Sequence, residues 1–401
     1  MKRKIFVSLL VIAVLLFPMG CTSKSPAGVS QAETAPLSWL LKFVPYTPGN
    51  QLVYNDILTL SADQNSTIPS RQASSNEVVE WWVSIENHFL VKSYVAPLRT
   101  DIWGFDAVEV ESFLTVMGER SITIVGGRLD TDVFREMLRS FKYAEESYLG
   151  YPVFSGIPKA RLIDSPTLDP RVFEVMPRAF AIIDGLQVKG NKVNVVLMAD
   201  VSTDKPPVQD EVAEAKNVIQ GVLRAYQEKT TLAYQTGGIT AFAYSLGKAG
   251  SAFIANAADL RFDETIKLLG RHPVKTIIEL SIGPGKLSLY NQVAITFRQK
   301  GDDSLLEFVL AYADSATAMT NVSVLQSRLN ESYTPSGITG VGKIGPLSQF
   351  WTVQSVKAEG SFLRAVVKLS EQASNSYSFS KELIQDHNLL FLYPGSSESI
   401  R

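Results

Sequence analysis

The sequence predicts an α+β fold, with antiparallel sheets built from hairpins, helices packed on one face, and two lobes. Three pairs of alternating apolar runs are each separated by a short turn that contains glycine. Other stretches carry apolar residues at helical spacing. Hairpins and helices alternate towards the C-terminus, an order typical of an α+β chain rather than of parallel βαβ units.

Each hairpin turn contains a glycine beside a polar residue, the strongest short-range hairpin signal. The predicted strand pairs are 180–183 with 193–198, 292–298 with 305–312, and 350–356 with 362–369. The turns contain Gly190, Gly301 and Gly360. A short strand at 389–393 is expected near the end of the chain.

Four stretches have apolar residues three or four positions apart, which places them on one face of a helix. They are 208–226 (after Pro206-Pro207), 318–329, 131–141 and 106–114. The expected N-terminal caps are Asp314 or Ser315, Asp130 or Thr131, and Asp106. Aspartates at these places are better explained as caps than as ligands.

The first twenty residues have the pattern of a secretory signal peptide. Lys2, Arg3 and Lys4 precede an apolar run at 5–17. Thirteen helical residues rise only about 20 Å, which is short for a hydrocarbon core of about 30 Å. The charged flank and the short run therefore favour an exported precursor over a membrane span.

The run ends at Met19-Gly20-Cys21, which resembles the lipobox of bacterial lipoproteins. The resemblance implies that Cys21, the only cysteine of the chain, carries the lipid. Each buried CH₂ contributes about 0.8 kcal/mol, so two or three acyl chains would hold the chain on one leaflet. Residues 21–36 are small and polar, as expected of a flexible tether.

The remaining residues are enough for two domains. We expect an N-terminal lobe at 37–229 and a C-terminal lobe at 230–401, with the proline-rich stretch 157–177 as the rival boundary. Without the basic residues of the signal peptide, 35 basic residues face 40 acidic ones, a formal charge of −5. That balance, without a basic run, disfavours nucleic acid as a partner.

Three glycine- or aromatic-containing motifs resemble those of uncharacterised bacterial envelope lipoproteins. They are Trp103-Gly104-Phe105-Asp106, Gly126-Gly127-Arg128-Leu129-Asp130 and Tyr148-Leu149-Gly150-Tyr151. The resemblance implies an envelope location and no particular activity.

Ala243-Tyr244-Ser245-Leu246-Gly247 is close to the nucleophile elbow G-x-S-x-G of serine hydrolases. A strand at 239–244 and a helix at 250–258 would flank it, and Asp314 with His387 or His272 would complete a triad. Hairpins rather than parallel βα units follow, however. We therefore expect Ser245 to be structural and predict no catalytic residue.

Residues 337–344 nearly match a phosphate-binding loop, but Ile344 replaces the hydroxyl residue and no helix follows. Asp130, Asp132 and Glu136 could share a cation, although a helix start explains them better. The only other histidine is His88, and no metal-ligand spacing is present. No metal or cofactor is predicted.

Aromatic residues are concentrated at 81–105. Val78, Trp82, Ile85 and Phe89 share one helix face and are expected in the core. Trp81 would point about 100° away from that face, so spacing alone does not decide whether it is exposed. Tyr94, Trp103 and Phe105 lie close in sequence.

These observations favour a lipid-anchored extracytoplasmic protein that binds a ligand or partner, or has a structural role, without catalysis. Its expected location is the cell membrane, or the outer membrane of a cell that has one, with the lipid on Cys21 as the membrane contact. A solute-binding component of a transporter is the alternative. A serine hydrolase using Ser245 ranks behind it.

Overall fold

The structure is a computed structural model of the chain. It describes residues 36–45, 51–86, 89–90, 106–118, 121–158, 176–188, 190–199, 209–234, 246, 249–260, 262–269, 275–334, 345–374, 383–384 and 389–396.

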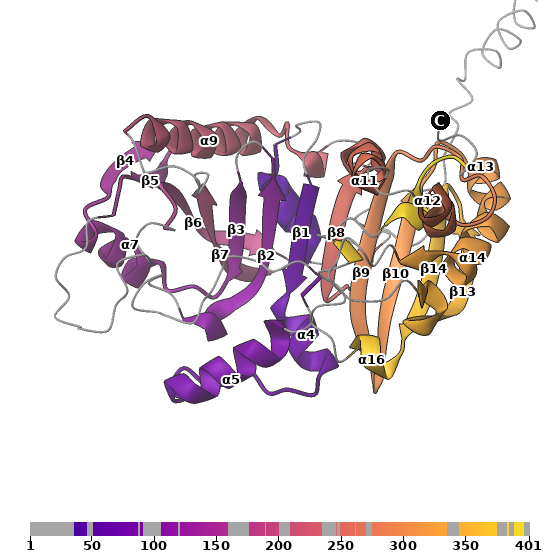
Figure 1. The fold of residues 1–401 in the computed structure, drawn as a ribbon. Coiled ribbons are helices and arrows are strands. Elements are labelled where there is room, and N and C mark those ends of the chain that lie inside the picture. The colour runs from indigo at the N-terminus through magenta and orange to yellow at the C-terminus, as the bar shows by residue number, and fades with distance from the viewer. Residues whose placement is uncertain are drawn as a thin grey trace, which may run out of the picture.

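One antiparallel sheet of 12 strands runs through the whole molecule, in the order β13-β14-β10-β9-β8-β1-β2-β3-β7-β6-β5-β4 (Figure 1). Its strands are β1 (Gln51–Asp56), β2 (Val110–Met117), β3 (Ile122–Gly127), β4 (Ala144–Tyr148), β5 (Tyr151–Ser155), β6 (Ala179–Val188), β7 (Asn191–Ala199), β8 (Ser251–Asn256), β9 (Gln292–Lys300), β10 (Asp303–Ala311), β13 (Trp351–Glu359) and β14 (Phe362–Leu369). Strands β11 (Tyr333–Thr334) and β12 (Gly345–Pro346) form a separate small sheet. The predicted α+β class is confirmed.

The two halves of the sheet repeat one strand order. In the first half the order is β1-β2-β3-β7-β6, and in the second it is β8-β9-β10-β14-β13. The halves meet where β1 pairs antiparallel with β8, with Val53 opposite Phe253. The two halves therefore share one strand order and meet at an antiparallel pair formed by the first strand of each half.

Helices cover one face of the sheet in both halves. They are α4 (Ile57–Asp63), α5 (Ser75–Glu86), α7 (Thr131–Ser140), α11 (Phe262–Leu269), α12 (Lys275–Ile282), α13 (Ser315–Thr320) and α14 (Val322–Glu331). Their apolar side chains form one cluster with alternate strand residues, among them Phe113, Phe253 and Phe308. The alternation follows from the two-residue period of a strand.

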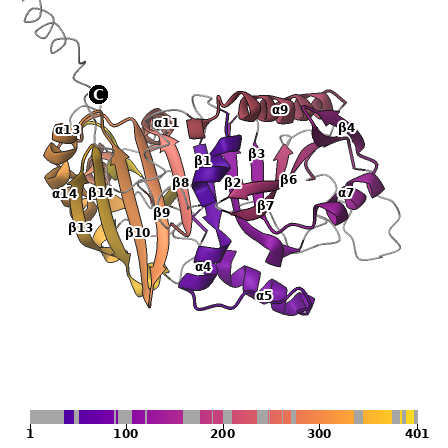
Figure 2. The same cartoon turned by 180° about the vertical axis from the view of Figure 1, so that it is seen from behind.

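The second face is covered over the first half and the centre. There α3 (Pro36–Leu40), the 3₁₀ turn η1 (Leu41–Phe43) and α9 (Gln209–Glu228) pack on strand residues such as Leu114 and Leu197. On β9, β10, β14 and β13 no described helix crosses this face (Figure 2). It carries ion pairs instead: Glu307 lies 2.8 Å from Arg298 and 2.9 Å from Arg364.

The three predicted hairpins are confirmed, with positive φ angles at Gly190, Gly301 and Gly360. The helices expected at 208–226, 318–329 and 131–141 correspond to α9, to α13 with α14, and to α7. None of the described helices is both long and apolar enough to cross a membrane.

Three sequence-based predictions are wrong. After Asp106 comes a single 3₁₀ turn, η2 (Ala107–Glu109), and then β2, not a helix. The apolar spacing that suggested a helix also fits β2, because that strand is buried on both faces. The helix at 250–258 that a nucleophile elbow at Ser245 would require is likewise wrong, because Ser251–Asn256 form strand β8, buried at the centre of the sheet.

The third wrong prediction is the final strand at 389–393, which is a short 3₁₀ turn, η6 (Leu390–Leu392). Its three residues are all buried in the helix-covered core, so no alternation between two faces is required of them.

Candidate functional site

A hollow of about 740 Å³ lies between α5 and the loop that joins α4 to it. We call it the α5 hollow. It is lined by hydroxyl groups, one amide, two carboxylates and a few apolar groups: Ser66, Thr67, Ile68, Pro69, Ser70, Gln72, Ala73, Glu77, Glu80, Trp81 and Ser84. It is wide open to solvent, so it is a surface depression rather than an enclosed cavity.

A capping box at the start of α5 sets the direction of the helix. Glu77 Oε2 accepts hydrogen bonds from Ser74 N at 2.7 Å and from Ser74 Oγ at 2.8 Å, while Glu77 N donates to Ser74 Oγ. Residues three, four and seven positions further along a helix share one face. Glu80, Trp81 and Ser84 therefore line the α5 hollow together with Glu77.

Trp81 connects the α5 hollow to the core. Its side chain is only 6% exposed, and its ring packs edge-on against Trp82 with the centroids 5.8 Å apart. Trp82 contacts Phe89, and Phe89 contacts Phe113 of β2 in the same way. The core positions predicted for Trp82 and Phe89 are confirmed, and Trp81 is buried as well.

Arg71, in the loop between α4 and α5, contacts two residues beside the central strands, Glu109 and Arg128. Its guanidinium lies 2.8 Å from Glu109 Oε1 and donates to Arg128 O at 3.2 Å. The other carboxylate oxygen of Glu109 accepts a hydrogen bond from Asp130 N at 2.9 Å. Burial raises the pKa of Glu109, and the hydrogen bond from Asp130 and the charge of Arg71 oppose that shift.

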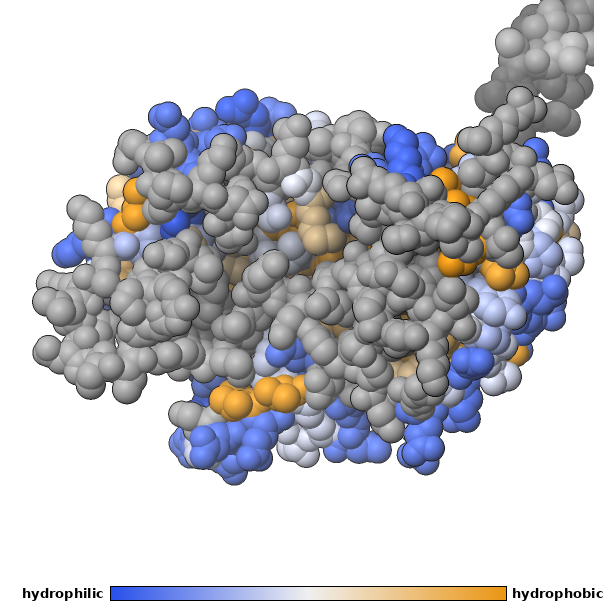
Figure 3. Space-filling model, in the orientation of Figure 1, coloured by the Kyte–Doolittle hydropathy of each residue, from blue (hydrophilic) through white to orange (hydrophobic). Residues whose placement is uncertain are grey.

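The α5 hollow is negatively charged. Among the residues that the structure describes, its lining contains two carboxylates and no lysine, arginine or histidine. The hydrogen bonds from Ser74 lower the pKa of Glu77, so that carboxylate is ionised at neutral pH. Hydrophobic and hydrophilic side chains lie side by side over α5 (Figure 3). A ligand of this surface would meet acidic groups beside apolar ones.

Two polar atoms of the lining are buried without a partner in the described part of the chain: Ser66 Oγ and Trp81 Nε1. An unpaired buried donor costs about 1–3 kcal/mol.

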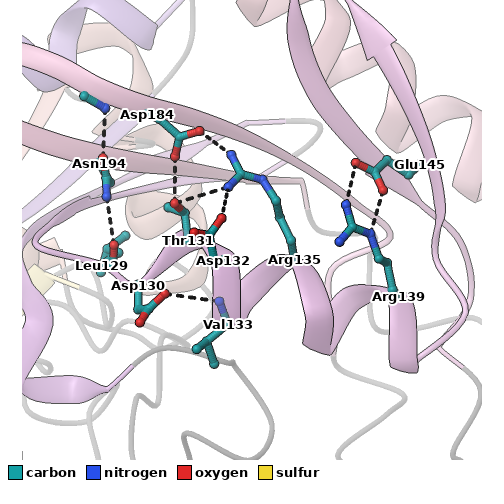
Figure 4. A network of polar contacts seen from close by, with 11 residues as sticks. Leu129, Asp130, Thr131, Asp132, Val133, Arg135, Arg139, Glu145, Asp184 and Asn194 are labelled. Atoms are coloured by element: carbon teal, nitrogen blue, oxygen red, sulfur yellow. Dashed lines mark hydrogen bonds and ion pairs between the residues drawn. The ribbon is translucent and has the colours of Figure 1, made fainter.

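The acidic residues at the start of α7 form a helix cap and an ion network (Figure 4). Asp130 Oδ1 accepts a hydrogen bond from Val133 N at 3.2 Å, and Asp132 lies 2.7 Å from Arg135. Arg135 also pairs with Asp184, which accepts a hydrogen bond from Thr131. Asp130 and Asp132 are thus used in helix capping and ion pairing, and Glu136 is exposed.

Among the residues that the structure describes, no three potential metal-ligating side chains come together. Asp314 accepts hydrogen bonds from Thr317 N and Oγ1 at 2.7 and 2.8 Å, and so caps α13 as predicted. The remaining candidates lie outside the described residues: Cys21, His88, Ser245, His272, 337–344 and His387.

Comparison with known proteins identifies no family. No family model matches the chain, and no curated protein matches it. Crystal form I of TP0453 is similar at 8% identity and a TM-score of 0.36, over 85% of this chain and 96% of that one. Crystal form IV has 10% identity and a TM-score of 0.35, over 83% and 94% of the two chains. Crystal form III has 8% identity and a TM-score of 0.31, over 86% and 97%.

Proposed function

We propose that this chain is a lipid-anchored extracytoplasmic protein that binds a ligand in the α5 hollow and does not catalyse a reaction. The observation that carries the binding function is the lining of the hollow. Hydroxyl, amide and carboxylate groups converge there around a buried indole, on a helix that is packed into the core. Concave surfaces that present placed polar groups are common sites of ligand recognition.

The anchor part of the proposal depends on Cys21. We expect the mature N-terminus to be an acylated Cys21, because a charged, apolar and Gly-Cys sequence occurs in that order. Mass spectrometry of the N-terminal peptide, purified from membranes of a bacterium that expresses the full chain, would detect the diacylglyceryl group. A soluble secreted product with a free thiol at Cys21 would contradict the proposal. The Cys21→Ala variant, which cannot accept the lipid, is the control.

The binding part is tested by filling the α5 hollow. Ser84→Phe places a ring among the lining residues, and we expect it to reduce ligand binding at least about tenfold by excluding the ligand. Saturation-transfer NMR of residues 37–401 against sugars, amino acids, peptides and amines would find ligands and compare the two proteins.

Ser140→Phe is a matched control for this substitution. Ser84 Oγ donates to Trp81 O at 2.7 Å, and Ser140 Oγ donates to Met137 O at 2.7 Å. Each substitution therefore removes a hydrogen bond of the same kind, but of the two serines only Ser84 lines the hollow. Equal binding by the wild-type and Ser84→Phe proteins would refute a site at α5.

The solute-binding alternative receives less support. Two-lobed receptors that close around a solute need a hinge between the lobes. Here β1 and β8 pair over four successive positions, from Leu52–Ile254 to Asn55–Ser251, and one apolar cluster extends across both halves. We retain the lobe boundary between 229 and 230 as part of the proposal. That boundary would divide one continuous sheet into two halves.

A further inference from the structure

We propose that the hairpin tip between β4 and β5 rests in the surface of the lipid bilayer to which Cys21 is anchored, and that Leu149 is the residue that enters the bilayer. This inference rests on the proposed lipid anchor and adds the face of the molecule that meets the membrane. It follows from an apolar residue in an unusual turn, from the tyrosines beside it, and from the place where the tether joins the fold.

The tip is a two-residue turn in which a leucine has a left-handed backbone conformation. Tyr148 of β4 pairs with Tyr151 of β5, and the φ angles of Leu149 and Gly150 between them are 52° and 85°. Two positive φ angles are typical of a type I′ turn, whose first central position usually holds asparagine, aspartate or glycine. This conformation is unfavourable for leucine, and Leu149 is 42% exposed. The other non-glycine residues with a positive φ angle in the described chain are polar: Asn65, Lys142 and Lys229.

Tyrosines continue the surface of the tip. The ring centroid of Tyr151 lies 6.4 Å from that of Tyr226 in α9, and Arg224 donates to Tyr148 Oη at 2.8 Å. Burial raises the pKa of Tyr226, and the neighbouring Tyr151 and Tyr234 raise it further. Tyr234, which follows α9 in the sequence, is 39% exposed. Tyrosine combines an apolar ring with a polar hydroxyl group, so it is enriched where a membrane meets water.

The tether joins the fold close to these tyrosines. The elements α3 and η1 lead from Pro36 to Phe43, whose ring centroid lies 4.6 Å from that of Tyr226. Residues 22–35 separate Cys21 from Pro36, and a flexible linker of that length spans on the order of 20 Å. An acylated Cys21 would therefore hold the tyrosines and the tip within reach of the bilayer.

The small size of this surface favours a lipid bilayer over a protein partner. One leucine and four partly exposed tyrosines present less area than the roughly 800 Å² that each partner gives to a standard protein interface. A bilayer contact needs less area, because the lipid on Cys21 already supplies the attachment. The tip then has only to orient the protein on the membrane.

The test places a fluorescent label next to the tip of the full, lipidated chain. Ser147→Cys adds a thiol at an exposed position of β4. Because the lipid occupies the sulfur of Cys21, the only native cysteine, an environment-sensitive dye attaches to the new thiol alone. The protein is reconstituted in vesicles of phosphatidylcholine and phosphatidylglycerol, with and without spin-labelled lipid. We expect the dye emission to shift to shorter wavelength, and the spin-labelled lipid to quench it.

Met319→Cys, labelled in the same way, is the matched control. Met319 lies in α13, beside the second half of the sheet, and is 63% exposed. A dye at this position should show neither the emission shift nor the quenching.

Leu149→Asn separates the role of the leucine from that of the turn. Asparagine suits the positive φ angle, so the midpoint of urea unfolding should not fall. In the labelled Ser147→Cys protein, this substitution should remove most of the emission shift and of the quenching. Leu289→Asn, at a leucine that is 75% exposed in the second half of the chain, should leave both unchanged.

Equal quenching at the two label positions, or full quenching that persists in Leu149→Asn, would overturn the proposal. A lower urea midpoint for Leu149→Asn would also count against it, because the leucine would then be explained by the stability of the fold. If Cys21 is acylated and the tip stays in water, the proposed anchor survives that failure. A chain that receives no lipid would overturn both.

Discussion

Replacement of Arg328 with methionine is expected to lower the free energy of unfolding by about 3–5 kcal/mol, the usual effect of breaking a buried polar network. Arg328 lies in α14 and is fully buried. Its guanidinium donates to five carbonyl oxygens, those of Pro284, Gly285, Phe391, Tyr393 and Gly395. Methionine would fill similar space but donate to none of them.

The charge of Arg328 makes this site unusual. Its guanidinium is bonded to backbone carbonyls in the described structure, rather than to a carboxylate. Burial lowers the pKa of Arg328 to about 10, so the group still carries its charge at neutral pH. The carbonyl dipoles compensate part of the cost of burying that charge. Lysine at this position keeps the charge but not the planar fork of donors, and should restore only part of the stability.

Chemical denaturation of residues 37–401, followed by circular dichroism, would measure the effect. Arg139→Met is the matched control. That arginine is 52% exposed and pairs with Glu145 on the surface, so its loss should cost less than about 1 kcal/mol. If Arg328→Met were as stable as Arg139→Met, the network around η6 would not hold the segments together as described.

Gly127→Ala is expected to destabilise the fold by about 3 kcal/mol, the upper part of the usual cost of overpacking. A Cβ atom on Gly127 would lie 2.0 Å from the carbonyl oxygen of Glu109 and 2.8 Å from the backbone N of Glu111. Both atoms belong to backbone next to the irregular pairing of β2 with β3, between Val110 and Ser112. Backbone cannot rotate away as a flexible side chain would.

Gly221→Ala is the matched control, with an effect of opposite sign. Gly221 lies inside α9, is exposed, and has no atom within 4 Å of the position of an added Cβ. Alanine there should stabilise the protein by about 0.5–1 kcal/mol, because glycine is a poor helix former. Urea unfolding of both variants measures the difference. A neutral effect of Gly127→Ala would contradict the close approach of the two strands.

The parts of the fold that were predictable have local causes. Each hairpin combines two alternating runs with a glycine that adopts a positive φ angle, so a few neighbouring residues determine it. Asp130 and Asp314 cap their helices through the next few residues. These turns and caps can therefore be predicted from a few neighbouring residues alone.

The wrong predictions concern segments whose surroundings decide their structure. Strands β2 and β8 lie at the centre of the sheet and are buried on both faces, so they lack the alternation that identifies a strand. The motif Gly126-Gly127 can be seen in the sequence, but the sequence does not show why glycine is needed at these two positions. A Cβ on Gly126 would lie 2.0 Å from the ring of Trp39 in α3, a contact between segments far apart in the chain.

The α5 hollow could be anticipated only in part. The sequence contains two signals for it: the offset of Trp81 from the core face of its helix, and the capping pattern Ser74-x-x-Glu77. The loop residues 66–73 resemble an ordinary polar connection. Their role depends on Arg71, which reaches Glu109 through a contact that no local pattern reveals.

The ladder between β1 and β8 also has a consequence for the order in which the chain folds. Leu52 pairs with Val116 on one side and with Ile254 on the other. The second partner is synthesised about 200 residues later, so this edge of β1 stays open while the first half is already complete. Open edges invite pairing with other chains, and contacts so distant in sequence form slowly. Until β8 is available, this edge of β1 is therefore open to pairing with another chain.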